Sequence, residues 1–241
     1  MKLKLIALLL LPILAFAQWE MDFDEDFAAT SSAWSPLKLG IKLAGWFDAS
    51  DVTTVTTNAS GNITLWADKS ANGRDASPLS GDVYYTASQY ATFNGGILSV
   101  AAFTASNACV IAVLQNIATN RINYFLGNRD YGFYSGGSYY GYTGYGVRDN
   151  DGLTTRSATT HNTALNVVFI NKSGVFLNAA ALEMTTTGSI GVLTMDRIGG
   201  RDTGTLNAQS RIHELLILDG LVTDAERISA QTYLKNKWGT P

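Results

Sequence analysis

The chain has 241 residues, of which 46% are hydrophobic, 11% are aromatic and only 15% are charged. This length suits one β domain of ordinary size or two small ones, and a charged share below the usual ~25% is more typical of an exported β protein than of a helical cytosolic one. The formal net charge of −3 gives no basic footprint for nucleic acid, so we expect no nucleic-acid partner. Cys109 is the one cysteine, so an intrachain disulfide is excluded, and its apolar run CVIAVL predicts a small buried side chain.

Residues 1–17 have the three parts of a secretory signal peptide. Lys2 and Lys4 precede the apolar run LIALLLLPILAFA, which ends in an Ala15-Phe16-Ala17 cleavage site. The run is shorter than the ~20 residues of a membrane-spanning helix. The segment resembles bacterial secretory signals. We therefore expect a secreted or cell-surface bacterial protein that contacts a membrane only if residues 1–17 are retained.

Residues 18–36 are acidic and then Ser/Thr-rich, and they predict a leader or linker before a single domain at residues 37–241. In that domain short apolar runs alternate with Gly, Asn and Asp, which is typical of an all-β sandwich or barrel. The expected strands are Ile41–Phe47, Ile63–Trp66, Val83–Thr86, Tyr90–Phe93, Ile97–Val100, Cys109–Gln115, Ile122–Leu126, Tyr131–Tyr134, Gly144–Arg148, Leu165–Asn171, Val175–Leu177, Met195–Ile198 and Arg211–Leu218.

Two of these apolar runs share one pattern, in which Trp is followed within two residues by Asp and then by a Ser/Asn/Gly loop. The runs end at Trp46-Phe-Asp48 and at Trp66-Ala-Asp68. Trp and β-branched residues suit a half-buried sheet surface, and Asp-x-Ser loops bond their own backbone to close tight turns. The pair predicts a β-arch or hairpin with both indoles buried.

The last predicted element is a helix that begins after Thr223. Thr223-Asp-Ala-Glu226 is a capping box, and Gly239 can take the left-handed conformation after the last turn. Ala225, Ile228, Thr232 and Leu234 give a rough apolar face. We expect this helix to cover an open end or edge of the sandwich, with Trp238 as its anchor.

These motifs resemble a known superfamily. GWFDASD (45–51), LWADKSANGRDA (65–76) and ATFNGG (91–96) are similar to the first half of concanavalin A-like lectin/glucanase domains of the laminin-G-like type, and residues 211–239 are similar to the closing strand and helix of bacterial and phage members. The resemblance implies a two-sheet antiparallel jelly-roll sandwich with one C-terminal α-helix, with ligands on the concave sheet or rim loops and Ca²⁺ in some members. Fold alone does not carry function.

The glucanase branch places two carboxylates on one strand for retaining hydrolysis, in the pattern E-x-D-x-x-E. Glu20, Asp22 and Glu25 fit the pattern but lie directly after the signal peptide, ahead of every core strand. We interpret them as a solvated acidic leader and assign no catalytic residue.

A second candidate is a cation site at Asp68, Ser70, Asn72 and Asp75, which resembles the first half of a Ca²⁺ loop. Leu79 stands where such a loop has its bidentate Glu. An Asx-turn network is the favoured interpretation, so no cofactor is expected and Ca²⁺ stays an alternative.

The third candidate is the segment 124–145, which interleaves tyrosine with Gly and Ser. Tyrosine offers a flat apolar face and a hydroxyl at low entropic cost, which suits the recognition of sugars or proteins. The predicted ligand-binding residues are Tyr131, Tyr134, Tyr139, Tyr140 and Tyr142; structural Tyr/Gly packing or a subunit contact is the alternative.

His213-Glu214 on the last strand lacks the second His of a zinc motif. We expect Glu214 to bind backbone or loop groups.

Together these features predict an exported, non-catalytic binding module for carbohydrate or a cell-surface partner, as in adhesion. The alternative is a structural subunit of a virion fibre, capsid decoration or extracellular filament that self-associates; a glycoside hydrolase comes third.

Overall fold

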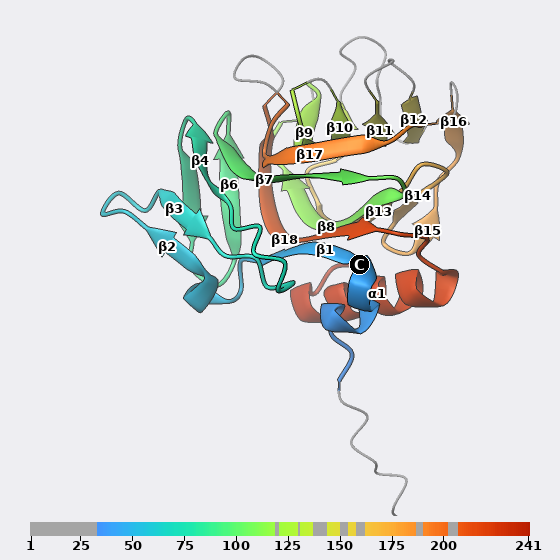
Figure 1. Cartoon of the computed structure of the whole chain (residues 1–241), viewed down its shortest axis with the longest axis horizontal. Helices are drawn as coiled ribbons and strands as arrows, with labels where there is room; N and C mark the ends of the chain where they lie inside the picture. Colours follow the sequence, from blue (N-terminus) through green and yellow to red (C-terminus); the bar gives the residue numbers. More distant parts are fainter. Residues whose placement is uncertain are drawn as a thin grey trace, which may run out of the picture. The chain divides into compact units, whose positions relative to one another are not determined.

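Two antiparallel β-sheets packed face to face form the main body of the computed structural model (Figure 1). The structure describes residues 33–118, 121–129, 131–136, 144–149, 154–157, 162–186, 190–201 and 207–241. Residues 34–241 form one compact unit. The predicted signal peptide, and the carboxylates Glu20, Asp22 and Glu25, lie outside the described residues.

Sheet A contains the longest of the described strands, and the first strand of the unit pairs with that long strand. Its order is β15 (Ala180–Ala181), β14 (Val175–Leu177), β13 (Leu165–Ile170), β8 (Ala108–Asn116), β18 (Gln209–Asp219), β6 (Tyr90–Asn94) and β5 (Val83–Thr86), and β1 (Leu43–Asp48) also pairs with β18.

Sheet C lies opposite sheet A. Its order is β16 (Met184–Thr186), β12 (Thr154–Ser157), β11 (Gly144–Arg148), β10 (Gly132–Gly136), β9 (Asn123–Gly127), β17 (Leu193–Ile198), β7 (Ile97–Ala105) and β4 (Ser77–Ser80). A separate two-stranded sheet B joins β2 (Val55–Thr57) to β3 (Ile63–Trp66). The predicted all-β antiparallel sandwich is confirmed.

The main core fills the space between sheets A and C. Large side chains from both sheets, among them Phe47, Phe93, Phe133 and Met195, are fully buried there. Trp66 has no exposed surface, and its ring meets Phe47 edge-on with centroids 5.6 Å apart. Since aromatic rings bury large areas and favour such tilted contacts, Trp66 anchors sheet B to this core.

A second core covers the outer face of sheet A. In β8 the residues Val110, Ala112 and Leu114 face sheet C, whereas Cys109, Ile111 and Val113 face the helix. A strand that is buried on both faces reads as a continuous apolar run, and CVIAVL is such a run. The prediction that Cys109 is a buried side chain is confirmed, since it is 2% exposed.

Helix α1 (Asp224–Trp238) is the predicted C-terminal helix, with both ends as expected. Thr223 and Glu226 form the reciprocal capping box, and Gly239 is left-handed at φ 63°. The predicted position was wrong, because α1 lies on the outer face of sheet A against β8 and β13 and not on an open end or edge (Figure 1).

Of the predicted apolar face of α1, Leu234 is buried, but Ala225, Ile228 and Thr232 are exposed, so most of that prediction was wrong. Ile228 is 49% exposed, while Arg227, Ala230, Gln231 and Leu234 are buried. Arg227 can be buried because it donates to Gln231 (3.0 Å) and lies 3.8 Å above the Phe176 ring. A buried arginine whose guanidinium has such partners therefore forms part of the packed face.

Differences from the predicted strands are concentrated at the two Trp-Asp motifs and in short edge strands. The 3-10 helix η2 (Pro36–Lys42) occupies the start of the expected strand at Ile41, and η3 (Val52–Thr54) precedes β2. β1 pairs with β18 and β3 pairs with β2, so the two motifs do not form one hairpin with each other. Both indoles are nevertheless buried, at 7% exposure for Trp46 and 0% for Trp66.

In the part of the chain that the structure describes, no helix has the length and apolar character needed to cross a membrane.

Candidate functional site

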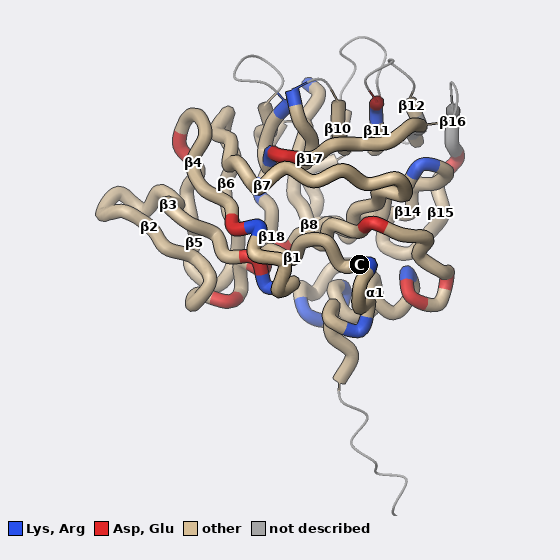
Figure 2. Tube along the Cα trace, viewed as in Figure 1, with Lys and Arg blue, Asp and Glu red and all other residues tan. Residues whose placement is uncertain are grey.

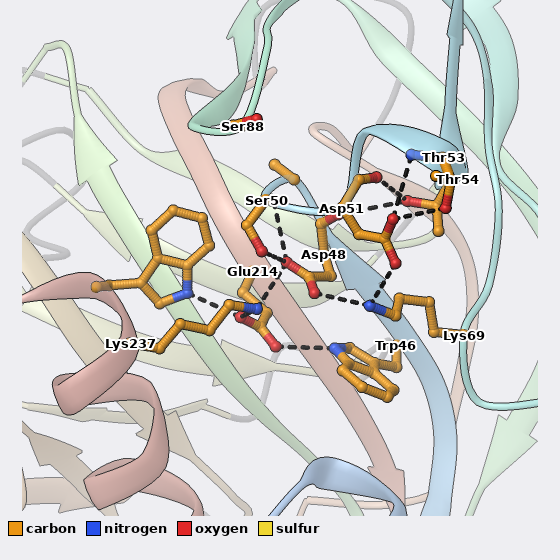
Figure 3. Close-up of polar contacts among 12 residues, drawn as sticks. Trp46, Asp48, Ser50, Asp51, Thr53, Thr54, Lys69, Ser88, Glu214 and Lys237 are labelled. Atoms are coloured by element: carbon orange, nitrogen blue, oxygen red, sulfur yellow. Dashed lines mark hydrogen bonds and ion pairs between the residues drawn. The ribbon is translucent and has the colours of Figure 1, made fainter.

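A buried carboxylate, Glu214 on β18, is the centre of a polar cluster beneath helix α1 (Figure 3). Glu214 has no exposed surface and accepts hydrogen bonds from the indole of Trp46 (2.8 Å), the indole of Trp238 (2.8 Å) and the ammonium of Lys237 (2.6 Å). We call Trp46, Asp48, Asp51, Lys69, Glu214, Lys237 and Trp238 the Glu214 cluster. Its partners are side chains, so the prediction that Glu214 binds backbone or loop groups was wrong.

A β-bulge explains why Glu214 points to the helix. The pairing of β18 with β8 shifts register between Ile212 and Glu214. A bulge adds one residue to a strand and re-aims the side chains beside it. Ile212 and Leu215 therefore face the main core, while Glu214 lies toward α1.

Two lysines link Glu214 to the carboxylates of the β1 loop. Lys237 lies 2.8 Å from Asp48, and Lys69 lies 2.9 Å from Asp48 and 2.8 Å from Asp51. Burial disfavours the charge of Asp48, but hydrogen bonds from Lys237, Ser50 and Lys69 outweigh it and lower the pKa of Asp48. Burial, together with the charge of Asp48, raises the pKa of Glu214. Lys69 and Lys237 keep raised pKa values because their ion pairs outweigh burial.

The Glu214 cluster has the features of a structural ion-pair network more than those of a pair of catalytic carboxylates. Asp48 and Glu214 are 3% and 0% exposed, and lysines or indoles occupy their oxygens. A retaining glycosidase needs two carboxylates on either side of a substrate bond. A pocket of about 80 Å³ in the described residues lies elsewhere, beside Asn107, Cys109 and Lys172. The Glu214 cluster ties β1, the loop after β3 and α1 to β18.

His213, the neighbour of Glu214, is held between two aromatic rings. Tyr90 and Trp238 meet its imidazole at 5.1 Å each, both edge-on, and His213 is 8% exposed. Burial, together with the charge of Arg211, lowers the pKa of His213 to about 4. A hydrogen bond with the backbone of Gln89 raises this pKa, but by less. His213 is thus a neutral packed ring at pH 7.

The loop of the calcium candidate is occupied by its own hydrogen bonds. Asp68 accepts from the amides of Trp46, Ser70 and Arg74 at 2.8–3.1 Å, and from the hydroxyl of Ser70 at 2.8 Å. Asp75 accepts from the amide of Asp68, and Asn72 donates to the carbonyl of Leu43. These are the bonds of the favoured Asx-turn interpretation. Calcium at Asp68, Ser70, Asn72 and Asp75 would have to displace them.

Of the predicted tyrosines, the structure describes Tyr131 and Tyr134, whereas Tyr139, Tyr140 and Tyr142 lie outside the described residues. Tyr134 is 1% exposed and packs against Tyr124, with ring centroids 5.5 Å apart, which agrees with the alternative of structural packing at this position and not with a ligand-binding ring. Tyr131 is half-buried, and its hydroxyl accepts from the amide of Thr194 at 3.2 Å. Ligand binding by Tyr131 stays a prediction.

The outer face of sheet C offers polar side chains that the sequence analysis missed. Ser77 pairs with Ser99 across β4 and β7, and Thr104 pairs with Thr194 across β7 and β17, with hydroxyl oxygens 3.3 and 3.1 Å apart. Arg197 follows on β17. The signal that could have revealed this face is alternation, since Leu98, Val100, Leu193 and Met195 between these positions are buried in the main core.

Similarity searches support the fold alone. No family model and no curated protein matches the chain. Among solved structures, a Trypanosoma rangeli sialidase in complex with the inhibitor DANA is 10% identical with a TM-score of 0.54, covering 78% of this chain and 32% of the sialidase.

Two botulinum neurotoxin domains are similar to the same degree. The serotype D binding domain is 10% identical with a TM-score of 0.53, covering 83% of this chain and 55% of that domain. The serotype D ligand binding domain in complex with N-acetylneuraminic acid is 11% identical with a TM-score of 0.51, covering 86% of this chain and 56% of that domain. The chain therefore spans between about a third and just over half the length of these proteins, and what it shares with them is an all-β sandwich fold.

Proposed function

We propose that this protein is an exported, non-catalytic carbohydrate-binding module of the concanavalin A-like, laminin-G-like kind, and that it binds saccharide on the outer face of sheet C. One observation carries the proposal. Helix α1 closes the outer face of sheet A, so within the described residues sheet C has the face without a helix over it (Figure 1). That face carries hydroxyl and guanidinium groups, which are the donors and acceptors that sugar hydroxyls require.

The neighbouring folds agree with this choice of ligand. One similar structure is a ligand binding domain in complex with N-acetylneuraminic acid, and another is a sialidase. The two Trp-Asp motifs and the closing strand and helix resemble the laminin-G-like type. Fold likeness at this identity supplies the architecture, and the ligand has to be argued from the face itself.

The state of the carboxylates supports binding without catalysis. A general acid or nucleophile has to reach its substrate. Glu214 and Asp48 instead neutralise Lys237 beneath α1. A glycosidase of this chain would need other carboxylates.

Export rests on residues 1–17, whose basic start, apolar run and Ala15-Phe16-Ala17 site fit a cleaved signal peptide. Intact mass of the protein recovered from the medium tests this proposal. A mass that includes residues 1–17 would contradict cleavage.

Binding is tested on a glycan array followed by titration calorimetry with the best saccharide. Ser99→Glu places bulk and negative charge on the outer face of sheet C, on strand β7 opposite Arg197, and we expect it to weaken binding at least tenfold. Thr232→Glu is the matched control, because Thr232 is an exposed hydroxyl residue on α1.

Equal loss of binding in both variants, or no loss in Ser99→Glu, would remove the sheet C face as the site. Light scattering on the same samples gives the oligomeric state. A stable polymer that binds no saccharide would favour the structural-subunit alternative over the binding module.

A further inference from the structure

The outer face of sheet C contains a row of residues with an arginine at each end. Arg148 on β11 lies opposite Gly132 on β10, Gly132 lies opposite Gly127 on β9, and Gly127 lies opposite Arg197 on β17. Residues directly opposite each other in a sheet place their side chains on the same face. Val147 and Ile198, the neighbours in sequence, are buried in the main core, so this row faces outward.

The two glycines are required at their positions. A Cβ at Gly127 would lie 2.3 Å from the carbonyl oxygen of Tyr131, and one at Gly132 would lie 2.3 Å from that of Leu126. No other residue fits without a backbone shift. Only the two arginines therefore contribute side chains to this row. Their backbones are three strand spacings, or about 14 Å, apart.

A third arginine extends the row toward the end of β17. The guanidinium of Arg201 lies 5.3 Å from the ring centroid of Tyr124, and Arg197 donates to the carbonyl of Arg201 at 2.9 Å. Tyr124 pairs with Tyr134 on the same outer face. In Figure 2 blue segments lie near β10, β11 and β17, with red segments beside them at β11 and β17. We call Arg148, Arg197 and Arg201 the arginine row.

The positive charge of the arginine row is incompletely neutralised within the described residues. Asp196 lies 3.4 Å from Nε of Arg197. The guanidinium of Arg148 forms no ion pair or hydrogen bond with a described residue, and its Nε is shielded from solvent without an acceptor. Its neighbour Asp149 is 4% exposed and accepts from the amide of Gly191. A guanidinium without an acceptor among the described residues favours an anionic ligand, because its charged donors form their strongest hydrogen bonds with anions.

We infer that the arginine row binds the carboxylate or sulfate group of an acidic saccharide. This inference rests on the proposed function and gives its ligand a chemical class. Guanidinium presents its donors in a planar fork that matches the two oxygens of a carboxylate. The hydroxyl pairs Ser77–Ser99 and Thr104–Thr194 lie on the same face and can hydrogen-bond to the uncharged sugars of the same saccharide.

The test uses the full protein with three polysaccharides: polygalacturonate for carboxylate, dextran sulfate for sulfate and dextran as the neutral control. Titration calorimetry compares the wild type with Arg148→Gln, Arg148→Lys and the charge-matched control Lys38→Gln, since Lys38 is exposed on η2. We expect the wild type to bind an acidic polymer and not dextran. Arg148→Gln should weaken binding about tenfold or more, Arg148→Lys should weaken it less, and Lys38→Gln should leave it unchanged. Thermal melts verify that each variant is folded.

The outcomes separate the inference from the proposed function. Whichever acidic polymer binds identifies the anion. Equal binding of dextran and the acidic polymers, or equal weakening by Arg148→Gln and Lys38→Gln, would overturn the arginine row while leaving carbohydrate binding in place. If no saccharide in the panel or on the glycan array binds, the proposed function itself fails. Should Arg148→Gln unfold, Arg148→Lys and the neutral polymer still decide the inference.

Discussion

Replacing Glu214 by alanine should loosen helix α1 from the sandwich. The change removes the acceptor of two indole N–H groups and one of the two carboxylate partners of Lys237. Lys237 keeps Asp48 at 2.8 Å, so the ammonium is not left alone. Each of the two orphaned indole donors costs about 1–3 kcal/mol. We expect the free energy of unfolding to fall by about 4 kcal/mol.

Urea unfolding followed by tryptophan fluorescence measures this loss, because Trp46 and Trp238 report on the cluster itself. For a domain of this size about 4 kcal/mol corresponds to a fall in Tm of about 8–16 °C. Glu214→Gln keeps one acceptor and should cost about half as much. Asp224→Ala is the control, since Asp224 is 84% exposed in its ion pair with Arg227 and such pairs contribute about 0–1 kcal/mol.

A loss below about 1 kcal/mol for Glu214→Ala would refute the reasoning, since the Glu214 cluster would then not hold α1 on sheet A.

Three further predictions concern pH, the helix cap and the core. The pKa of His213 is lowered from 6.5 to about 4 in the folded state, so the neutral His213 contributes its full stabilisation above pH 6.5, and about 3 kcal/mol of the free energy of unfolding is lost as the pH falls to 4. His213→Phe should flatten that part of the pH–stability curve. Equal slopes in the wild type and the variant would contradict a lowered pKa at His213. Thr223→Ala removes the side-chain acceptor of the Glu226 amide and should cost about 1 kcal/mol by urea unfolding, whereas a neutral effect would mean that the cap is dispensable. Gly199→Ala would place a Cβ 1.9 Å from Cδ1 of buried Phe93 at a φ of +85°, so we expect a loss of about 3 kcal/mol in the same assay; a variant as stable as the wild type would show that Phe93 can move away at little cost.

The features that could be predicted from the sequence are those set by neighbours in the chain. The capping box of α1 involves Thr223 and Glu226, three residues apart, and both predicted hydrogen bonds are present. Strand β11 begins and ends where the pattern predicted, at Gly144 and Arg148. Asp68 accepts from the amide of Ser70 two residues on. Such bonds require little chain closure, so local residue types determine them.

The predictions that were wrong depended on what packs against an element. The face of α1 was assigned from apolar residues alone, but Arg227 is buried because Gln231 and the Phe176 ring accommodate it. Tyr134 was predicted as a ligand-binding residue from its Tyr/Gly context, yet strand pairing places it against Tyr124. The short strands β2, β4, β12, β15 and β16 were missed because pairing at or next to a sheet edge, and not an apolar run, defines them.

The sequence by itself determined the all-β class, the buried indoles of Trp46 and Trp66, and the capped terminal helix. Only the tertiary structure decided what surrounds Glu214, because Trp46 is 168 positions away from it in the chain. The same holds for the arginine row, since Arg148 and Arg197 share a face through the order β11-β10-β9-β17. Alternation predicts which residues of one strand share a face. Strand order and register come from long-range pairing, and the packing of the whole core offsets the entropy lost when distant segments are brought together.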